Sequence, residues 1–204
     1  MRYLLLMLVI LPAIARSEPV ILVVGDSISA GFGVPVQQGW VALLQQELQQ
    51  DVPALKVINA SISGDTTAGG VNRLPALLQQ YQPELTIIEL GGNDGLRGMP
   101  LQRIRSNLLQ MVKLSRAAGS DVLLLGMQIP PNYGPRYSDG FRQLYRKLAE
   151  EESIPLLPFL LDGIATRPEL MQSDGIHPVT AAQPLMAAAV RPLVQHWLYA
   201  DSRI

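Results

Sequence analysis

Apolar residues along the chain alternate between short continuous runs and stretches with helical spacing. Val20 to Val24 is a run of β-branched residues and leucine that ends at Gly25, the pattern of a strand buried on both faces. Four later runs are similar, although prolines interrupt the last: Leu55 to Ile58, Leu85 to Leu90, Val122 to Gly126 and Ile154 to Phe159. The sequence therefore predicts five strands.

Between these runs, apolar residues recur three or four positions apart, as on one face of a helix. The clearest case runs from Leu101 to Val112. The other predicted helices are Trp40 to Leu48, Leu74 to Leu78, Phe141 to Leu148 and Ala181 to Leu198. Strands that alternate with helices through short loops form parallel sheets with helices on both faces. We therefore predict an α/β fold, a three-layer α/β/α sandwich around a mostly five-stranded parallel sheet.

The first residues have the pattern of a secretory signal peptide. Arg2 precedes the apolar run Tyr3 to Leu11, and Ala13-Ile14-Ala15 resembles a cleavage site. A membrane anchor is the alternative, but this run falls short of the roughly 20 apolar residues that span a bilayer. We predict a signal peptide over residues 1–17, cleaved after Ala15 or Ser17, followed by a single domain over residues 18–204 and no integral membrane span.

Composition narrows the classes of function. With 48% hydrophobic and 16% charged residues among 204, the chain can bury one core and is not disordered. A net charge of -1 without a basic run argues against nucleic-acid binding. The absence of cysteine excludes disulfides and thiol nucleophiles, and two histidines exclude a histidine-rich metal site. We expect small, neutral partners and no metal.

A candidate nucleophile follows the first predicted strand. Ser27, in Gly25-Asp26-Ser27-Ile28, lies at a strand-to-helix turn, where ligands bind in parallel α/β sheets. The alternative is that Ser27 only caps the next helix. The turn is neither the G-x-S-x-G elbow nor a glycine-rich phosphate loop, which disfavours phosphoryl and hydride transfer.

A serine nucleophile needs a base, and the base needs an orienting acid. Asp174 and His177 lie three residues apart in Asp174-Gly175-Ile176-His177-Pro178, so one loop can aim the carboxylate at Nδ1 and leave Nε2 facing Ser27. Alternatively, they are a turn residue and a helix-start residue. His196 has no carboxylate at helical spacing, and we interpret it as structural.

Acyl transfer also needs donors to the developing oxyanion. Gly64 follows the second strand and can expose its N–H, and the side chain of Asn93, after the third strand, can donate. Either segment alone is also typical of an ordinary turn. Asp26 and Asp94 flank these positions without a required chemical role, and we assign them to loop hydrogen bonding.

Taken together, these segments resemble the four sequence blocks of the GDSL or SGNH hydrolases, which have a flavodoxin-like fold. The matching residues, in order, are Gly25-Asp26-Ser27, Gly64, Gly91-Gly92-Asn93-Asp94 and Asp174-Gly175-Ile176-His177. The resemblance implies that Ser27 is the nucleophile, His177 the general base and acid, and Asp174 its orienting partner. It also implies an oxyanion hole formed by Ser27, Gly64 and Asn93.

Within that family, GDSISAGFG, NASISGDTTAGG, LGGNDGLRG and SDGIHP are similar to segments of a secreted Gram-negative group of acyl-CoA thioesterases, lysophospholipases and arylesterases. The likeness implies a periplasmic or secreted monomer that hydrolyses acyl esters and thioesters without a cofactor.

We predict that the apolar residues Ile129, Pro130 and Tyr133 bind the acyl chain, since their loop follows the fourth strand. Arg97 and Arg136 are the nearest cations, and we interpret both as surface residues. Three alternatives remain open: a carbohydrate O-deacetylase, an acyltransferase, and a non-catalytic periplasmic lipid-binding module.

Overall fold

The fold is built on a five-stranded parallel sheet with strand order β2-β1-β3-β4-β5. The computed structural model describes residues 18–200, so the predicted signal peptide lies outside the described residues. The strands are β1 Val20–Gly25, β2 Lys56–Asn59, β3 Leu85–Glu89, β4 Asp121–Leu125 and β5 Leu156–Leu157. The predicted parallel sheet is confirmed.

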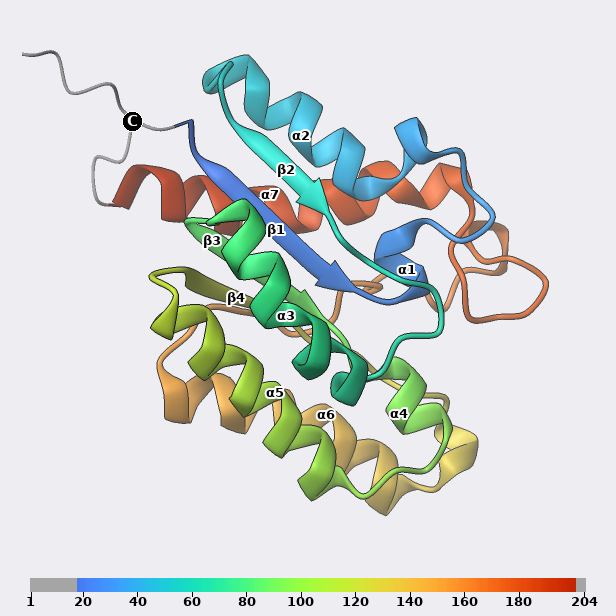
Figure 1. Ribbon diagram of the computed structural model, residues 1–204. Helices are drawn as coiled ribbons and strands as arrows, with labels where there is room; N and C mark the ends of the chain where they lie inside the picture. Colours follow the sequence, from blue (N-terminus) through green and yellow to red (C-terminus); the bar gives the residue numbers. More distant parts are fainter. Residues whose placement is uncertain (1–17, 201–204) are drawn as a thin grey trace, which may run out of the picture.

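Helices cover both faces of the sheet, as Figure 1 shows. One face packs against α2 Trp40–Asp51 and α7 Gln183–Ala200. The other packs against α3 Thr67–Tyr81, α5 Leu101–Ala117 and α6 Pro135–Glu152. The three-layer α/β/α sandwich is therefore confirmed.

The central strand β1 explains why its sequence lacks an apolar and polar alternation. Ile21 and Val23 belong to the apolar core on one face, and Leu22 and Val24 to the core on the other, all four with no exposed surface. A fully buried side chain of this size contributes roughly 1.5 to 3 kcal/mol to folding. Burial of both faces thus holds fixed the strand that carries the candidate nucleophile at its end.

The structure differs from the sequence prediction in short elements. Two helices follow strands directly and are too short to show a hydrophobic period: α1 Ser27–Ala30 after β1 and α4 Gly92–Leu96 after β3. Strand β5 has two residues, where we predicted a run from Ile154 to Phe159. Pro155 and Pro158 flank it and have no N–H to donate to a ladder, which limits its length.

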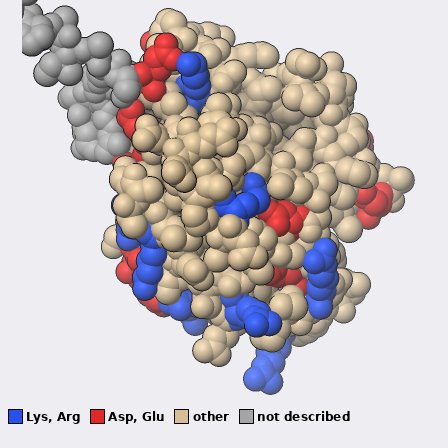
Figure 2. Space-filling model, in the orientation of Figure 1, with Lys and Arg blue, Asp and Glu red and all other residues tan. Residues whose placement is uncertain are grey.

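The remaining described elements are short 3₁₀ turns: η1 Val36–Gln38, η2 Pro131–Tyr133, η3 Pro168–Leu170 and η4 Thr180–Ala182. No helix within residues 18–200 combines the length and the apolar character needed to cross a bilayer. On the face drawn in Figure 2, Lys and Arg are interspersed with Asp and Glu, and most of the surface is uncharged.

Candidate active site

The candidate segments meet at the carboxyl end of the sheet. Strands β2 and β3 lie on opposite sides of β1, so the chain reverses its direction of strand addition there. Such a reversal opens a crevice between the loops that follow the strands. Ser27 follows β1, Gly64 follows β2, and Asn93 follows β3. The strand order therefore brings three of the predicted site residues to one edge.

Ser27 is the first residue of the single-turn helix α1. Asp26 caps this helix, because its Oδ1 accepts a hydrogen bond from the N–H of Ile28 at 3.0 Å. The helix ends after Ala30, where Gly31 has a left-handed conformation with φ of 74°. The cap and the glycine confine the helix to one turn. Helix capping at this position is performed by Asp26, which leaves the Ser27 hydroxyl for other contacts.

Ser27, His177 and Asp174 form a hydrogen-bonded chain. The Oγ atom of Ser27 lies 2.8 Å from Nε2 of His177, and Nδ1 of His177 lies 2.7 Å from Oδ2 of Asp174. A carboxylate can only accept at Nδ1, so the proton of a neutral imidazole lies on Nδ1. The lone pair of Nε2 then faces the Ser27 hydroxyl. This is the arrangement required for base-assisted attack by a serine.

A tight turn holds the carboxylate of Asp174. Its Oδ1 accepts from the backbone N–H groups of Ile176 at 2.9 Å and His177 at 3.0 Å, and Gly175 permits the turn with φ of 67°. The hydrogen bond from the His177 N–H, the side-chain bond to the same residue and the Ile176 N–H lower the pKa of Asp174 to about 2. Asp174 is therefore an anion at neutral pH.

Gln172 fixes the His177 loop to the rest of the molecule. Its N–H donates to the His177 carbonyl at 2.7 Å, and its Nε2 donates to the carbonyl of Phe32 at 2.7 Å and of Pro178 at 3.1 Å. The Phe32 ring also packs on the imidazole, with centroids 4.6 Å apart. Gln172 could not be predicted as part of the site, because an isolated glutamine in a loop carries no local signal in the sequence.

Three donors border the space in front of Ser27. No hydrogen bond ties the backbone N–H of Ser27 or Gly64 to another of the described residues. Gly64 has φ of 79°, and a Cβ placed on it would meet no atom within 4 Å. The side chain of Asn93 is already oriented, since Nδ2 donates to the Asp65 carbonyl at 2.9 Å and to Oδ2 of Asp26 at 3.2 Å. The bond to Asp26 is the longer of the two, so its hydrogen can be shared with a second acceptor in the cavity.

A cavity of about 590 Å³ opens at this point. Ser27, Gly64, Asn93 and His177 line it, and so do the predicted acyl-site residues Ile129 and Pro130. Tyr133 is not among the lining residues. Its hydroxyl instead donates to the Leu96 carbonyl at 2.8 Å, and its ring borders a second, smaller surface pocket together with Arg136.

Part of the cavity wall comes from the segment after β5, which sequence analysis did not assign to the site. Its lining residues are Phe159, Leu160, Leu161, Ala165 and Thr166. The local signal was present, because Phe159-Leu160-Leu161 continues the apolar run beyond Pro158 after a strand. Arg97 lies on the surface, with Nη2 3.3 Å from the Gly64 carbonyl. Among residues 18–200, no cluster of three or more His, Asp or Glu side chains could hold a metal.

Comparisons with known proteins give a consistent result. Residues 23–183 match the model of the GDSL-like lipase/acylhydrolase family. The chain is 53% identical to the esterase TesA of Pseudomonas aeruginosa, over 86% of this chain and 87% of that protein. It is 45% identical to thioesterase 1/protease 1/lysophospholipase L1 of Escherichia coli, over 94% and 92%. The crystal structure of a Pseudoalteromonas esterase, EstA, inhibited by monoethylphosphonate, has a TM-score of 0.84 and 42% identity, covering 89% of this chain and 99% of that one.

Proposed function

The chain belongs to the GDSL-like lipase/acylhydrolase family and is an esterase of that family, and from this premise we propose that it cleaves acyl esters and thioesters through an acyl-enzyme on Ser27. The observation that carries this proposal is the continuous hydrogen-bonded chain from Ser27 through His177 to Asp174, with contacts of 2.8 and 2.7 Å. These contacts supply a nucleophile, a base and an orienting acid in one line.

In the proposed reaction, Oγ of Ser27 attacks the acyl carbonyl carbon while Nε2 of His177 takes the hydroxyl proton. The tetrahedral intermediate collapses, the imidazolium gives its proton to the leaving alcohol or thiol, and the acyl group stays on Ser27. Water then attacks the acyl-enzyme with His177 again as base. Release of the carboxylic acid restores the serine hydroxyl. The anionic Asp174 stabilises the imidazolium that forms in both halves of the reaction.

The oxyanion receives hydrogen bonds from the N–H groups of Ser27 and Gly64 and from Nδ2 of Asn93. Asn93 enters the hole with its amide plane already fixed by Asp26 and by the Asp65 carbonyl. The bond to Asp26, the longer of the two, becomes shared with the oxyanion as charge develops. Because these donors need no reorientation, they stabilise the transition state more than the bound ester.

The substrate class follows from the cavity and from the relatives. The wall of the cavity is largely apolar. Its lining side chains include Ile129, Pro130, Phe159 and Leu161, which favours an acyl chain over a polar substituent. Relatives are named as an arylesterase and as a thioesterase/lysophospholipase. We propose aryl esters, acyl-CoA thioesters and lysophospholipids of medium to long acyl chains as substrates of a monomeric enzyme.

The cellular location is proposed from the sequence. The pattern of residues 1–17 supports export to the periplasm or the medium, with cleavage after Ala15 or Ser17. N-terminal sequencing of the protein recovered from the periplasm of a Gram-negative host tests both points. Recovery of the intact N-terminus from the cytoplasm would contradict them.

The test of the activity uses the mature protein and its Ser27→Ala variant. Both are assayed on p-nitrophenyl esters from acetyl to palmitoyl and on the matching acyl-CoA series. We expect serine-dependent turnover that rises toward longer chains, and nearly complete loss in the folded variant. Activity confined to acetyl esters would support an O-deacetylase instead. Product formed only with an added alcohol acceptor would support an acyltransferase.

A further inference from the structure

Three polar side chains form a buried cluster behind the proposed oxyanion hole: Asp26, Ser29 and Glu89. Glu89 is the last residue of β3 and has no exposed surface, and Asp26 and Ser29 are each 2% exposed. Oε2 of Glu89 accepts from the Ser29 hydroxyl at 2.6 Å and from the N–H of Asp26 at 3.3 Å. One carboxyl group thus joins the end of β3 to the turn that carries Ser27.

The cluster reaches the hole through Asp26. The same residue that donates its N–H to Glu89 accepts from Nδ2 of Asn93 at 3.2 Å and from the Ile28 N–H at 3.0 Å. Glu89 is among the residues that line the cavity, but it forms no hydrogen bond to Ser27 or to the proposed oxyanion donors. Its influence on the oxyanion space passes through the position of Asp26, and its influence on Ser27 passes through Asp26 and through Ser29 of the same helix.

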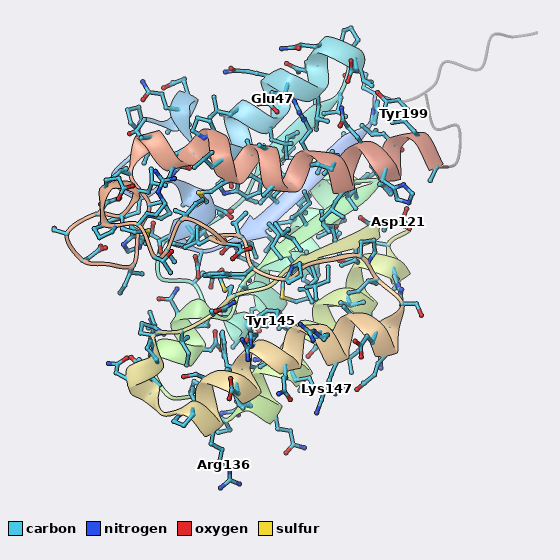
Figure 3. The ribbon with its side chains drawn as sticks, turned by 180° about the vertical axis from the view of Figure 1, so that it is seen from behind. Glu47, Asp121, Arg136, Tyr145, Lys147 and Tyr199 are labelled. Carbon is cyan, nitrogen blue, oxygen red and sulfur yellow. The ribbon has the colours of Figure 1, made fainter. Side chains whose placement is uncertain are left out.

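Two glycines occur where the backbone passes close to buried polar side chains, one beside the cluster and one beside Tyr145. A Cβ on Gly25 would lie 2.6 Å from Oε2 of Glu89 and 2.7 Å from Cβ of Ser29. A Cβ on Gly91 would overlap the Tyr145 hydroxyl, which donates to the Leu90 carbonyl at 2.9 Å. Figure 3 shows Tyr145 on α6, on the side of the helix that faces the sheet. The strand ends are thus packed directly against buried polar groups.

The surroundings of Glu89 disfavour a charge on it. Its Oε1 atom has no hydrogen-bond partner among the described residues, and no ion pair of residues 18–200 includes it. Asp26 is the titratable group whose charge acts on Glu89, and Tyr145 from α6 and Asp94 from α4 lie nearby without a positive charge. His177 and Asp65 act on Asp26. Complete burial, followed by the charge of Asp26, raises the pKa of Glu89 well above its usual value.

His177 and the cationic Arg73 lie beyond Asp26 and the end of β1. His177 faces Asp26, and Arg73 from α3 donates to the Gly25 carbonyl at 3.3 Å. Neither forms an ion pair with Glu89. A carboxylate at Glu89 would therefore be a buried anion with one unsatisfied oxygen, an arrangement that is strongly unfavourable in proteins.

We propose that Glu89 is a positioning residue that acts as a neutral carboxylic acid, holding Asp26 so that Asn93 and the Ser27 turn stay in the geometry of the oxyanion hole. This inference rests on the proposed function, since the hole serves the reaction on Ser27. Neutrality is part of the role. A second anion behind the hole would oppose the negative charge that develops there, and this repulsion is strong in a low-dielectric site.

The test compares Glu89→Ala with the isosteric Glu89→Gln. The amide oxygen of glutamine can accept from Ser29 and Asp26, and its NH₂ group takes the place of a protonated Oε1. We expect Glu89→Ala to lower kcat about 10-fold or more with little change in KM, by loosening one oxyanion donor. Glu89→Gln restores most of this loss. Thr86→Val is the matched control, because Thr86 is equally buried on β3 and bonds Ser120 at 2.8 Å, away from the site. We expect Thr86→Val to lower the free energy of unfolding and to leave kcat unchanged.

Infrared difference spectra of the wild type against Glu89→Gln test the protonation state directly. At neutral pH we expect the C=O band of a protonated acid in the wild type and no carboxylate band assigned to Glu89. Carboxylate bands, or a Glu89→Gln variant as impaired as Glu89→Ala, would overturn the proposal, as would wild-type kcat in Glu89→Ala. If Glu89→Ala does not fold, the kcat of Glu89→Gln and the infrared spectra still test the proposal. If the wild type cleaved no ester, the proposed function would fail, while the spectra would still report on Glu89.

Discussion

Arg73 and Asp65 form an ion pair with Nε of the guanidinium 2.8 Å from Oδ2 of the carboxylate, and both side chains are largely shielded, with 19% and 11% of their surface exposed. The same guanidinium donates to the carbonyls of Ala60 and Gly25. The carbonyl of Asp65 in turn accepts from Asn93. A single side chain from α3 therefore joins the end of β1 to the loop that carries Gly64 and orients Asn93.

Replacing Arg73 with methionine removes these bonds and keeps a similar apolar stem. We expect kcat to fall about 10-fold, because all three proposed oxyanion donors lose part of their support. Since the pair is partly buried, unfolding free energy should fall by about 1 to 3 kcal/mol. Steady-state kinetics and urea unfolding measure the two effects.

Arg142→Met is the matched control for this prediction. Arg142 pairs with Asp139 at 2.9 Å, but both side chains are more than half exposed, and such pairs contribute about 0.5 kcal/mol or less. An Arg73→Met variant that behaved like Arg142→Met in both measurements would show that the guanidinium does not support the hole.

Asp174→Asn tests the orienting role of the carboxylate. An amide at this position can donate to Nδ1, which places the imidazole proton on Nε2, facing Ser27. We expect kcat to fall about 10³- to 10⁴-fold at nearly unchanged KM. Because the pKa of Asp174 is held at about 2 by its hydrogen bonds to His177 and Ile176, the carboxylate stays ionised above about pH 4. The carboxylate itself does not titrate between pH 6 and pH 8, so a large loss is expected at both values, and a variant that kept wild-type kcat at either pH would contradict this role.

Asp26 makes the stability of the folded state depend on pH. Its pKa is raised, whereas that of Asp174 is lowered. Burial, more than any other factor, raises its pKa from 3.8 to about 6. The folded state thus binds a proton more tightly than the unfolded state. The resulting stability is complete below about pH 4 and is lost as pH rises through about 6.

Urea unfolding of the wild type and Asp26→Asn at pH 4 and pH 7 measures this effect, since asparagine does not titrate. We expect the wild type to lose about 2 kcal/mol relative to the variant between these values. The pH range over which this stability is lost lies above the range in which Asp174 titrates, because the pKa of Asp174 in the folded state is about 2. A constant difference between the two proteins would mean that the pKa of Asp26 is not raised.

The sequence predicted those parts of the molecule whose signals are local. The core strands Val20–Gly25 and Leu85–Glu89 were found because burial on both faces produces continuous apolar runs. Helix α5 was found because its stripe is long enough to show a period. The helices α1 and α4 have four and five residues and show none, and the length of β5 depends on prolines as much as on apolar content.

The same distinction holds in the site. Ser27, Asp174 and His177 were proposed because their chemical types follow predicted strands or lie within one loop, and the structure brings the three together. Glu89 was missed because its partners Asp26 and Ser29 are 63 and 60 residues away in the chain. Arg73 was missed because its bond to the end of β1 spans 48 residues, although its ion-pair partner Asp65 is only 8 residues away. One local sign existed for Glu89, the only charged residue in the run Leu85 to Leu90. A charge inside a doubly buried strand indicates a polar partner that spacing cannot identify.

The loop after β4 provides the remaining prediction, on acyl chain length. Ile129 is 8% exposed and lines the cavity, whereas the Tyr133 hydroxyl bonds Leu96 outside it. Ile129→Ala removes apolar volume from the wall, so we expect the preferred acyl chain to become longer, with ratios of kcat/KM between neighbouring chain lengths changing about 10-fold. Tyr133→Phe should keep the wild-type profile and lose about 0.5 to 1.5 kcal/mol of stability at most. The p-nitrophenyl ester series separates the two residues. An unchanged profile in Ile129→Ala, or a shifted one in Tyr133→Phe, would place the acyl chain elsewhere, and the segment Phe159 to Leu161 on the same cavity would then be the next site to vary.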